Sequence, residues 1–365
     1  MNTERRLQAP ATAVRRVRLC CLTMWATGLE SVSAYLGQVQ HMDIRPFVTK
    51  PDDEALLRKA RLDCDWYAEN GRCFDALSHP TMQFLPAWTT GPAGLLELVQ
   101  RPRELAEERW FVLIGQRPQQ LGALAARTFA LLRKTGVKIA YYAFDEASRF
   151  MPCFREIAPF LDVLIHDEAP LDPAGERALS PQCVRLHRSW VANVVPFAAP
   201  FNPEPEKRIV FLGSQLGLTP HRQRQIEFLK ARFKDRFISI SDHSLAVGDR
   251  FSLNRYAVSL CPEGRKFGTP GMSQTHTDRP FWSGCLGLVP VSEDSSSGGR
   301  LDELSNANLI VRYPHGDLEA LAECCEKALS VTTEDRRRIY EHFNRHETVG
   351  TVLADAIARA SPTAT

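Results

Sequence analysis

The sequence lacks most of the short motifs that identify common enzyme classes. It contains no G-x-G-x-x-G dinucleotide fingerprint, no P-loop and no G-x-S-x-G nucleophile elbow. Its ten cysteines include no C-x-x-C pair, and no apolar run reaches the length of a membrane span. The formal net charge is only +2, so composition does not single out a polyanionic partner. These absences remove the usual grounds for predicting a dinucleotide enzyme, a P-loop NTPase, a hydrolase of the elbow type or a membrane-spanning protein.

The composition that is present is typical of a globular protein. Apolar residues make up 44% of the chain and charged residues 24%, and 365 residues are enough for two domains of ordinary size. Cys20, Cys21 and Cys261 lie in short apolar runs that predict buried strands. Such contexts, without a disulfide spacing, indicate reduced thiols and a cytoplasmic location.

Strands and helices alternate along the first half of the chain. The apolar and helical periodicities predict strands at residues 17–25, 110–115, 137–144 and 162–165, with helices at 29–39, 118–134 and 147–160. Strands that alternate with helices form a parallel sheet, and ligands bind beyond the carboxyl ends of its strands. The first half is therefore predicted to be a Rossmann-like α/β domain over residues 14–200.

Several polar residues follow these predicted strands directly. Asp145, His166 and Asp167 are the candidates for a catalytic base, and Trp25 and Gly28 are further candidates for ligand contacts, which the family resemblance given below places on the acceptor side. For each of them a helix cap or an ordinary turn is the alternative. No feature of the sequence selects among the three catalytic candidates.

A second α/β unit opens after a Pro/Glu/Lys-rich connection near residues 198–208. An apolar strand at 209–214 ends on Gly213 and Ser214, and a helix begins at about Pro220. Glycine at such a strand end lets a phosphate approach the backbone closely. Arg222 is predicted to point from the helix into the cleft between the two domains.

The stretch from Asn254 to Val291 organises the second unit. Two short apolar runs flank a polar loop, and residues 277–284 can form about two helical turns. Free backbone N–H groups and basic side chains at such a turn suit a diphosphate. The residues predicted to bind such a diphosphate are Gly213, Ser214, Arg222, Glu263, Gly264, Arg265, Thr277, Asp278 and Arg279, and the resemblance described next makes them donor-binding residues.

This stretch resembles the donor-sugar half of GT-B-type glycosyltransferases, especially the exostosin-like and spore-maturation-type families. Their pattern is a K/R-Y-x-x-x-L-x-P-x-G strand, a Thr/His-x-Arg-Phe helix and a G-x-x-P-V strand. The counterparts are Arg255 to Gly264, Thr277 to Gly284 and Gly287 to Val291. Those families usually carry a Glu after the helix aromatic, which holds a sugar or ribose hydroxyl. Trp282 follows Phe281 instead, with Asp278 or Glu263 as substitutes for that contact.

The resemblance implies a GT-B fold of two Rossmann-like domains facing a cleft, in which the last helices cross back to the first domain. It implies a glycosyltransferase that moves a sugar from a nucleotide-sugar to an acceptor hydroxyl on a glycan or small molecule. A nucleic acid acceptor is not favoured by the near-zero net charge. No metal and no further cofactor is expected. The domains would span residues 14–200 and 205–350, followed by a closing helix and tail at 351–365. Apolar residues at helical spacing predict the last three helices at 318–329, 333–346 and 349–360.

Two further motifs have residues of a metal-binding type, and two alternative functions remain. Asp63-Cys64-Asp65 is a D-x-D triplet, and His342 and His346 have a zinc-compatible spacing, but each lies in a predicted helix without further ligands. The alternatives to catalysis of the predicted kind are a glycosyltransferase-like protein that binds without catalysis and a glycosyltransferase that modifies nucleic-acid bases. The missing helix Glu supports the first, and Arg15, Arg16 and Arg18 would serve the second.

Overall fold

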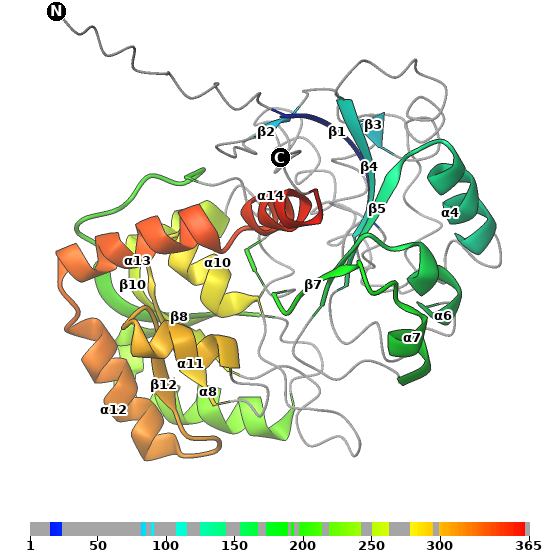
Figure 1. Ribbon diagram of the computed structural model, residues 1–365. Coiled ribbons are helices and arrows are strands. Elements are labelled where there is room, and N and C mark those ends of the chain that lie inside the picture. The colour runs from blue at the N-terminus through cyan, green and yellow to red at the C-terminus, as the bar shows by residue number, and fades with distance from the viewer. Residues whose placement is uncertain are drawn as a thin grey trace, which may run out of the picture.

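The chain forms an α/β fold of two separate parallel sheets with helices packed on them (Figure 1), which confirms the predicted fold class. The structure is a computed structural model. It describes residues 15–23, 82–84, 89–90, 107–114, 125–143, 154–166, 173–188, 191–192, 197–213, 219–241, 250–262, 278–294 and 299–361.

The first sheet is built from residues in the first half of the chain. Its strands are β1 (Arg15–Thr23), β2 (Met82–Phe84), β3 (Thr89–Thr90), β4 (Glu107–Ile114), β5 (Lys138–Tyr142), β6 (Val163–Ile165) and β7 (Val184–Leu186). Their order is β2-β1-β4-β5-β6-β7, with β3 also paired to β1, and all pairs are parallel. The described helices of this part are α4 (Ala125–Lys134), α6 (Phe154–Ile157), η4 (Ala158–Phe160) and α7 (Pro173–Ala178).

The second sheet follows residues 197–205. Its strands are β8 (Glu206–Gly213), β9 (Phe237–Ser241), β10 (Tyr256–Cys261), β11 (Val289–Glu293) and β12 (Val311–Tyr313), in the parallel order β12-β11-β10-β8-β9. The chain leaves β8 toward β9 and then returns past β8 to β10, so the strand order reverses between β8 and β10. In a doubly wound sheet this reversal opens a crevice at the carboxyl ends of the two strands, where ligands bind.

Side-chain caps start several helices around the second sheet. The helices there are α8 (Pro220–Phe233), η5 (Lys234–Arg236), η7 (Ser252–Arg255), α10 (Arg279–Cys285), α11 (Gly299–Asn306), α12 (Leu318–Leu329), α13 (Thr333–His346) and α14 (Val349–Ala360). In each of four helices the residue before the first turn accepts a hydrogen bond from a backbone N–H of that turn. These caps are Thr219 for α8, Asp317 for α12, Thr332 for α13 and Thr348 for α14. The predicted bounds of α12, α13 and α14 are confirmed to the residue.

The last of these helices, α14, packs against β6 and β7 of the first sheet rather than against the second. Val352, Leu353 and Ile357 are buried there, in one apolar cluster with alternate residues of the first sheet. At the end of α14, Lys138 Nζ donates to Ser361 Oγ at 2.8 Å, and Ser361 Oγ donates to a Glu108 oxygen at 2.6 Å. The expected return of the last helix to the first domain is therefore confirmed.

A second set of contacts joins the two parts of the chain around Glu347, between α13 and α14. Its carboxylate is buried and binds Arg188, which follows β7, at 2.9 Å, and also Arg300 of α11. Burial acts to raise the pKa of Glu347, but His342, whose Nε2 lies 3.6 Å from Glu347 Oε1, and the charges of Arg188 and Arg300 outweigh it and lower the pKa. Ala192 and Thr348 form a parallel bridge beside this cluster. The ion cluster and the bridge hold the two sheets in a fixed relation.

We expect Glu347→Gln to destabilise the protein by up to about 3 kcal/mol at pH 7, because it removes the buried partner of two arginines. A carboxyl with a lowered pKa stabilises the folded state above its unfolded pKa of roughly 4.3 and loses that contribution as pH falls through the folded value. The difference between wild type and variant should therefore shrink below about pH 4. Urea unfolding from pH 7 to pH 3 measures it, and a difference that stays constant over that range contradicts the assignment.

Candidate active site

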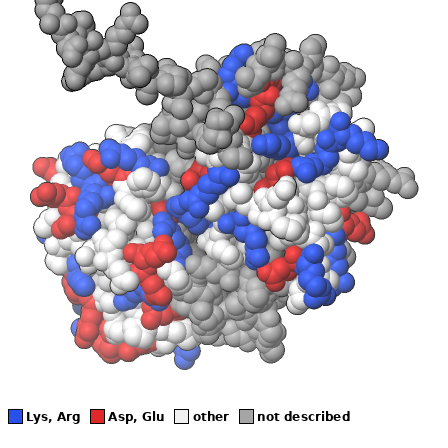
Figure 2. Space-filling view, in the orientation of Figure 1, with Lys and Arg blue, Asp and Glu red and all other residues white. Residues whose placement is uncertain are grey.

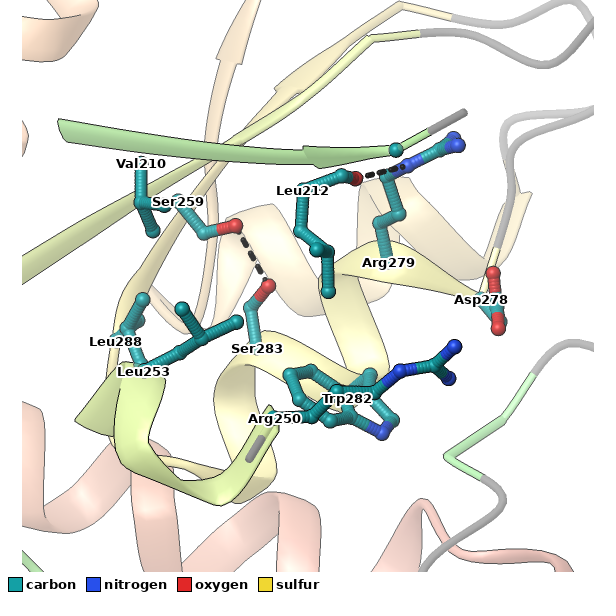
Figure 3. Close-up of a pocket in the computed structure, with 11 residues that line it drawn as sticks. Val210, Leu212, Arg250, Leu253, Ser259, Asp278, Arg279, Trp282, Ser283 and Leu288 are labelled. Carbon is teal, nitrogen blue, oxygen red and sulfur yellow. Dashed lines mark hydrogen bonds between the residues drawn. The ribbon is translucent and has the colours of Figure 1, made fainter. Parts of the chain in front are cut away.

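The side chain of Arg279 lies at the crevice between β8 and β10. It is the first residue of α10, and its Nε donates to the carbonyl oxygen of Leu212 at 3.1 Å. Its Cζ lies 5.8 Å from the centre of the Phe211 ring. In Figure 3 the guanidinium lies beside the carboxyl end of β8, with its terminal nitrogens directed beyond the strand. The sheet therefore places a half-buried positive charge where a ligand of this fold class binds.

Gly213, the last residue of β8, is what allows this approach. A Cβ built on Gly213 would lie 3.2 Å from Arg279 Nη2 and 2.7 Å from Phe211 Cζ. Any larger side chain would displace one of these two groups. Glycine at position 213 therefore keeps the backbone at the strand end accessible from the side of Arg279.

Buried hydroxyl groups fix the helix that carries Arg279. Ser283 Oγ of α10 donates to Ser259 Oγ of β10 at 2.8 Å, and both side chains are almost fully buried. The thiol of Cys261 lies 3.9 Å from Ser283 Oγ, and its burial raises its pKa to about 11. This thiol is therefore protonated and packs as a small apolar group. Because α10 has only seven residues and Asp278 makes no side-chain cap, the charge at this point comes from Arg279 rather than from the helix.

A cavity of about 90 Å³ opens beside Arg279. Its polar lining comes from Asp278, Arg279, Arg250, Ser259 and Ser283, and its apolar lining comes from Val210, Leu212, Leu253, Leu288 and Trp282, with Gly213 at the strand end (Figure 3). Pockets for whole ligands are usually about 300 Å³ or more, so the described residues alone do not enclose a ligand of that size. Arg250 was not among the predicted residues, because no motif marks the segment in which it lies.

Trp282 directly follows Phe281 on α10 and lines the cavity. Its ring stacks on Phe251 at a centroid distance of 6.4 Å and an interplanar angle of 25°. The indole forms one wall of the cavity, next to Asp278. An aromatic ring cannot accept a hydrogen bond from a hydroxyl as a carboxylate does, whereas the carboxylate of Asp278 lines the same cavity.

The structure brings together three of the predicted donor-binding residues: Gly213, Asp278 and Arg279. Arg222 lies elsewhere on α8, is only 4% exposed, and shares its helix face with Ile226, Leu229 and Phe233. Arg222 is not among the described residues that line the cavity beside Arg279, and its predicted place in the cleft between the domains stays a prediction. The remaining donor-binding candidates, Ser214, Glu263, Gly264, Arg265 and Thr277, lie outside the described residues.

Of the residues predicted in the first domain, the structure describes one, His166. It follows β6 at the carboxyl end of the first sheet, is 1% exposed, and its ring lies 4.4 Å from that of His187. The other candidates, Asp145, Asp167, Trp25 and Gly28, lie outside the described residues, as do Asp63 and Asp65. The choice of catalytic base stays a prediction.

Neither acidic nor basic side chains predominate on the described part of the face in Figure 2. Acidic and basic side chains are interspersed over both halves, and a group of basic side chains lies where the halves meet. Among the helices that the structure describes, none combines the length and apolar character needed to cross a membrane. Five described cysteines, Cys183, Cys261, Cys285, Cys324 and Cys325, are free thiols.

Comparison with known proteins gives similarity of overall structure only. No family model matches the sequence, and no curated protein matches it. Among solved structures, a mutant O-GlcNAc transferase of Thermobaculum terrenum is 12% identical, with 97% of this chain and 69% of that chain covered and a TM-score of 0.42. The lipopolysaccharide outer core galactosyltransferase WaaB is 10% identical, with 94% and 98% covered and a TM-score of 0.45.

A third matching structure is titled as a phosphatase domain, not as a transferase. The N-terminal domain of trehalose-6-phosphate phosphatase of Candida albicans is 9% identical, with 97% of this chain and 98% of that chain covered and a TM-score of 0.44. Because all three TM-scores lie below 0.5, we draw no conclusion about activity from these matches.

Proposed function

We propose that the protein transfers a sugar from a nucleotide-sugar to an acceptor hydroxyl, and that Arg279 binds the donor diphosphate. The observation that carries this proposal is the place of Arg279 at the crevice between β8 and β10, beside a glycine that leaves the strand end open. Guanidinium groups bind phosphate oxygens in two parallel hydrogen bonds. The motif resemblance over Arg255 to Val291 points to the same ligand.

The proposed chemistry requires stabilisation of the charge that develops on the leaving diphosphate. A fixed cation in a partly buried site provides this without a metal, because it needs little reorganisation during the reaction. Asp278 lines the cavity next to Arg279 and is proposed to accept a hydroxyl of the ribose or sugar. Where the transfer inverts the anomeric carbon, Asp145, His166 or Asp167 of the first domain is proposed to take the acceptor proton.

A second candidate function is binding of a nucleotide-sugar without transfer. Trp282 favours it, since this residue replaces the carboxylate that the related families use. Both candidates require the same diphosphate contact, so they differ only in turnover. The acceptor is proposed to be a glycan or small molecule.

The test is a panel of nucleotide-sugars, first ranked by thermal shift and then assayed for release of nucleoside diphosphate. We expect one nucleotide class to raise the melting temperature, and release to depend on an added acceptor. Because no step uses a metal, EDTA should leave nucleotide affinity and release unchanged, and manganese should not stimulate them.

The outcomes separate the candidates. Nucleotide binding without release in the presence of a broad set of acceptors supports the binding function. Release that EDTA abolishes and manganese restores contradicts the metal-independent mechanism, and would direct attention to Asp63 and Asp65. Absence of any nucleotide binding contradicts both candidates.

A further inference from the structure

The carboxyl edge of the second sheet carries a cluster of two histidines and one glutamate. His221 comes from the first turn of α8, Glu293 ends β11, and His315 lies just before α12. One nitrogen of each ring and one carboxylate oxygen all lie within 4.8 Å of one another. His221 Nε2 is 2.7 Å and His315 Nδ1 is 2.9 Å from Glu293 Oε1.

We propose that His221, Glu293 and His315 bind a divalent transition-metal ion of the zinc type. Two imidazoles and one carboxylate are a donor set of tetrahedral zinc sites that keep a fourth position open. Ligand atoms around such an ion are about 3.3 Å apart, given bond lengths of about 2.0 to 2.1 Å. The observed nitrogen-to-oxygen distances are within about 0.6 Å of that value, so small side-chain rotations admit the ion.

The surroundings of the cluster orient the three ligands. The Glu293 side chain is fully buried, and its Oε1 accepts from Gln225 Nε2 at 2.9 Å and from the Gly316 N–H at 3.0 Å. The two imidazole rings stack with their centres 4.4 Å apart. Hydrogen bonds to ligating carboxylates fix their direction and raise metal affinity. The His315 side chain is 34% exposed, which gives an ion and a fourth ligand a route from solvent.

The donor atoms of the cluster also indicate which ion it would bind. A neutral ring offers a free lone pair, and two imidazoles favour zinc over magnesium or calcium.

This site shares no residue with the cavity beside Arg279. The described lining of that cavity includes Val210, Ser259 and Asp278, but none of His221, Glu293 and His315. A metal bound by the cluster would join the starts of α8 and α12 to the end of β11.

The test uses the full chain, stripped with EDTA and desalted, and titrated calorimetrically with zinc chloride in phosphate-free buffer. We expect one zinc ion per chain, and at least a tenfold loss of zinc affinity in His315→Ala and in Glu293→Gln. Loss of a group that only orients a ligand already lowers metal affinity about 10-fold to 100-fold, and loss of a ligand should cost at least as much. His346→Ala is the matched control, because it removes an exposed histidine of another close pair, His342 and His346. Its zinc affinity should equal that of wild type.

Cobalt substitution supplies an independent readout. Bound Co²⁺ should show visible absorption of tetrahedral intensity without a strong sulfur-to-metal band, which would reveal cysteine ligands. Absence of saturable zinc binding in wild type, unchanged affinity in both ligand variants, or a sulfur band overturns the proposal. Nucleoside diphosphate affinity measured on the same samples should not change with zinc, so this result is independent of the proposed transferase function.

Discussion

Replacing Arg279 with alanine is expected to weaken nucleoside diphosphate binding at least tenfold. The change removes the cation at the crevice between β8 and β10 and its two parallel hydrogen bonds to phosphate oxygens. Loss of one partner of a hydrogen-bonded charge pair costs about 2 to 5 kcal/mol, and each 1.4 kcal/mol is about tenfold in affinity. Calorimetric titration of nucleoside diphosphate into wild type and variant measures the effect.

Two further variants make the Arg279 result specific. Arg279→Lys should recover only part of the affinity, because an ammonium group lacks the planar fork of guanidinium. Arg345→Ala removes the same charge from an exposed position on α13 and should leave affinity unchanged. If Arg279→Ala binds as wild type does, or melts far below it without ligand, then Arg279 is structural and the diphosphate site is misplaced.

The second large effect is expected on stability, from Gly284→Ala. Gly284 lies where α10 meets α13, and a Cβ there would lie 2.3 Å from both Cγ and Cδ2 of Phe343. Phe343 is fully buried, and the close atoms are at the base of its ring, so a small rotation does not relieve the overlap. Overpacking of a core typically costs 1 to 3 kcal/mol, and we expect about 3 kcal/mol here. Urea unfolding gives the value.

A double mutant tests the cause of that loss. Phe343→Leu alone opens a gap and destabilises the protein, but it also frees the space that the new methyl group needs. The pair Gly284→Ala and Phe343→Leu should therefore be more stable than the sum of the single changes predicts, by about 1 kcal/mol or more. If the losses of unfolding free energy in the two single variants simply add in the double variant, the overlap of the new methyl group with Phe343 is not the cause of the destabilisation.

The sequence predicted the elements that carry local signals. α12, α13 and α14 each have a capping Asp or Thr and apolar residues at helical spacing, and their bounds agree with the prediction. By contrast, β7, β9, α7 and α11 were missed. β7 has three residues, and α11 begins at Gly299, inside a Ser/Gly-rich stretch that predicts a loop. The residue that caps the carboxyl end of α8 is Lys234, with a φ of 52°, so the glycine that usually marks a helix end is absent before β9.

The candidate site was predictable only in part. The rule that ligands bind at strand ends correctly brought Gly213, Asp278 and Arg279 to one crevice. The burial of Arg222 follows from its own spacing, because residues 222, 226, 229 and 233 lie on one face of α8. The cluster of His221, Glu293 and His315 could not be predicted. Its members are 72 and 22 residues apart in sequence, and only the packing of three elements brings them together.

The position of α14 determines the order in which the chain can be assembled during synthesis. Residue 361 contacts residue 108 across 253 positions of sequence, and α14 packs on β6 and β7 of the first sheet. Contacts at such separation close late and slow folding, since much chain entropy is lost before they form. The first sheet leaves the ribosome early, yet the contacts of α14 with β6 and β7 cannot form until residues 349–361 have been made. The second sheet, complete at residue 313, has its own strands and helices α8 to α12 in continuous sequence. The part of the protein that is translated second is thus able to fold first.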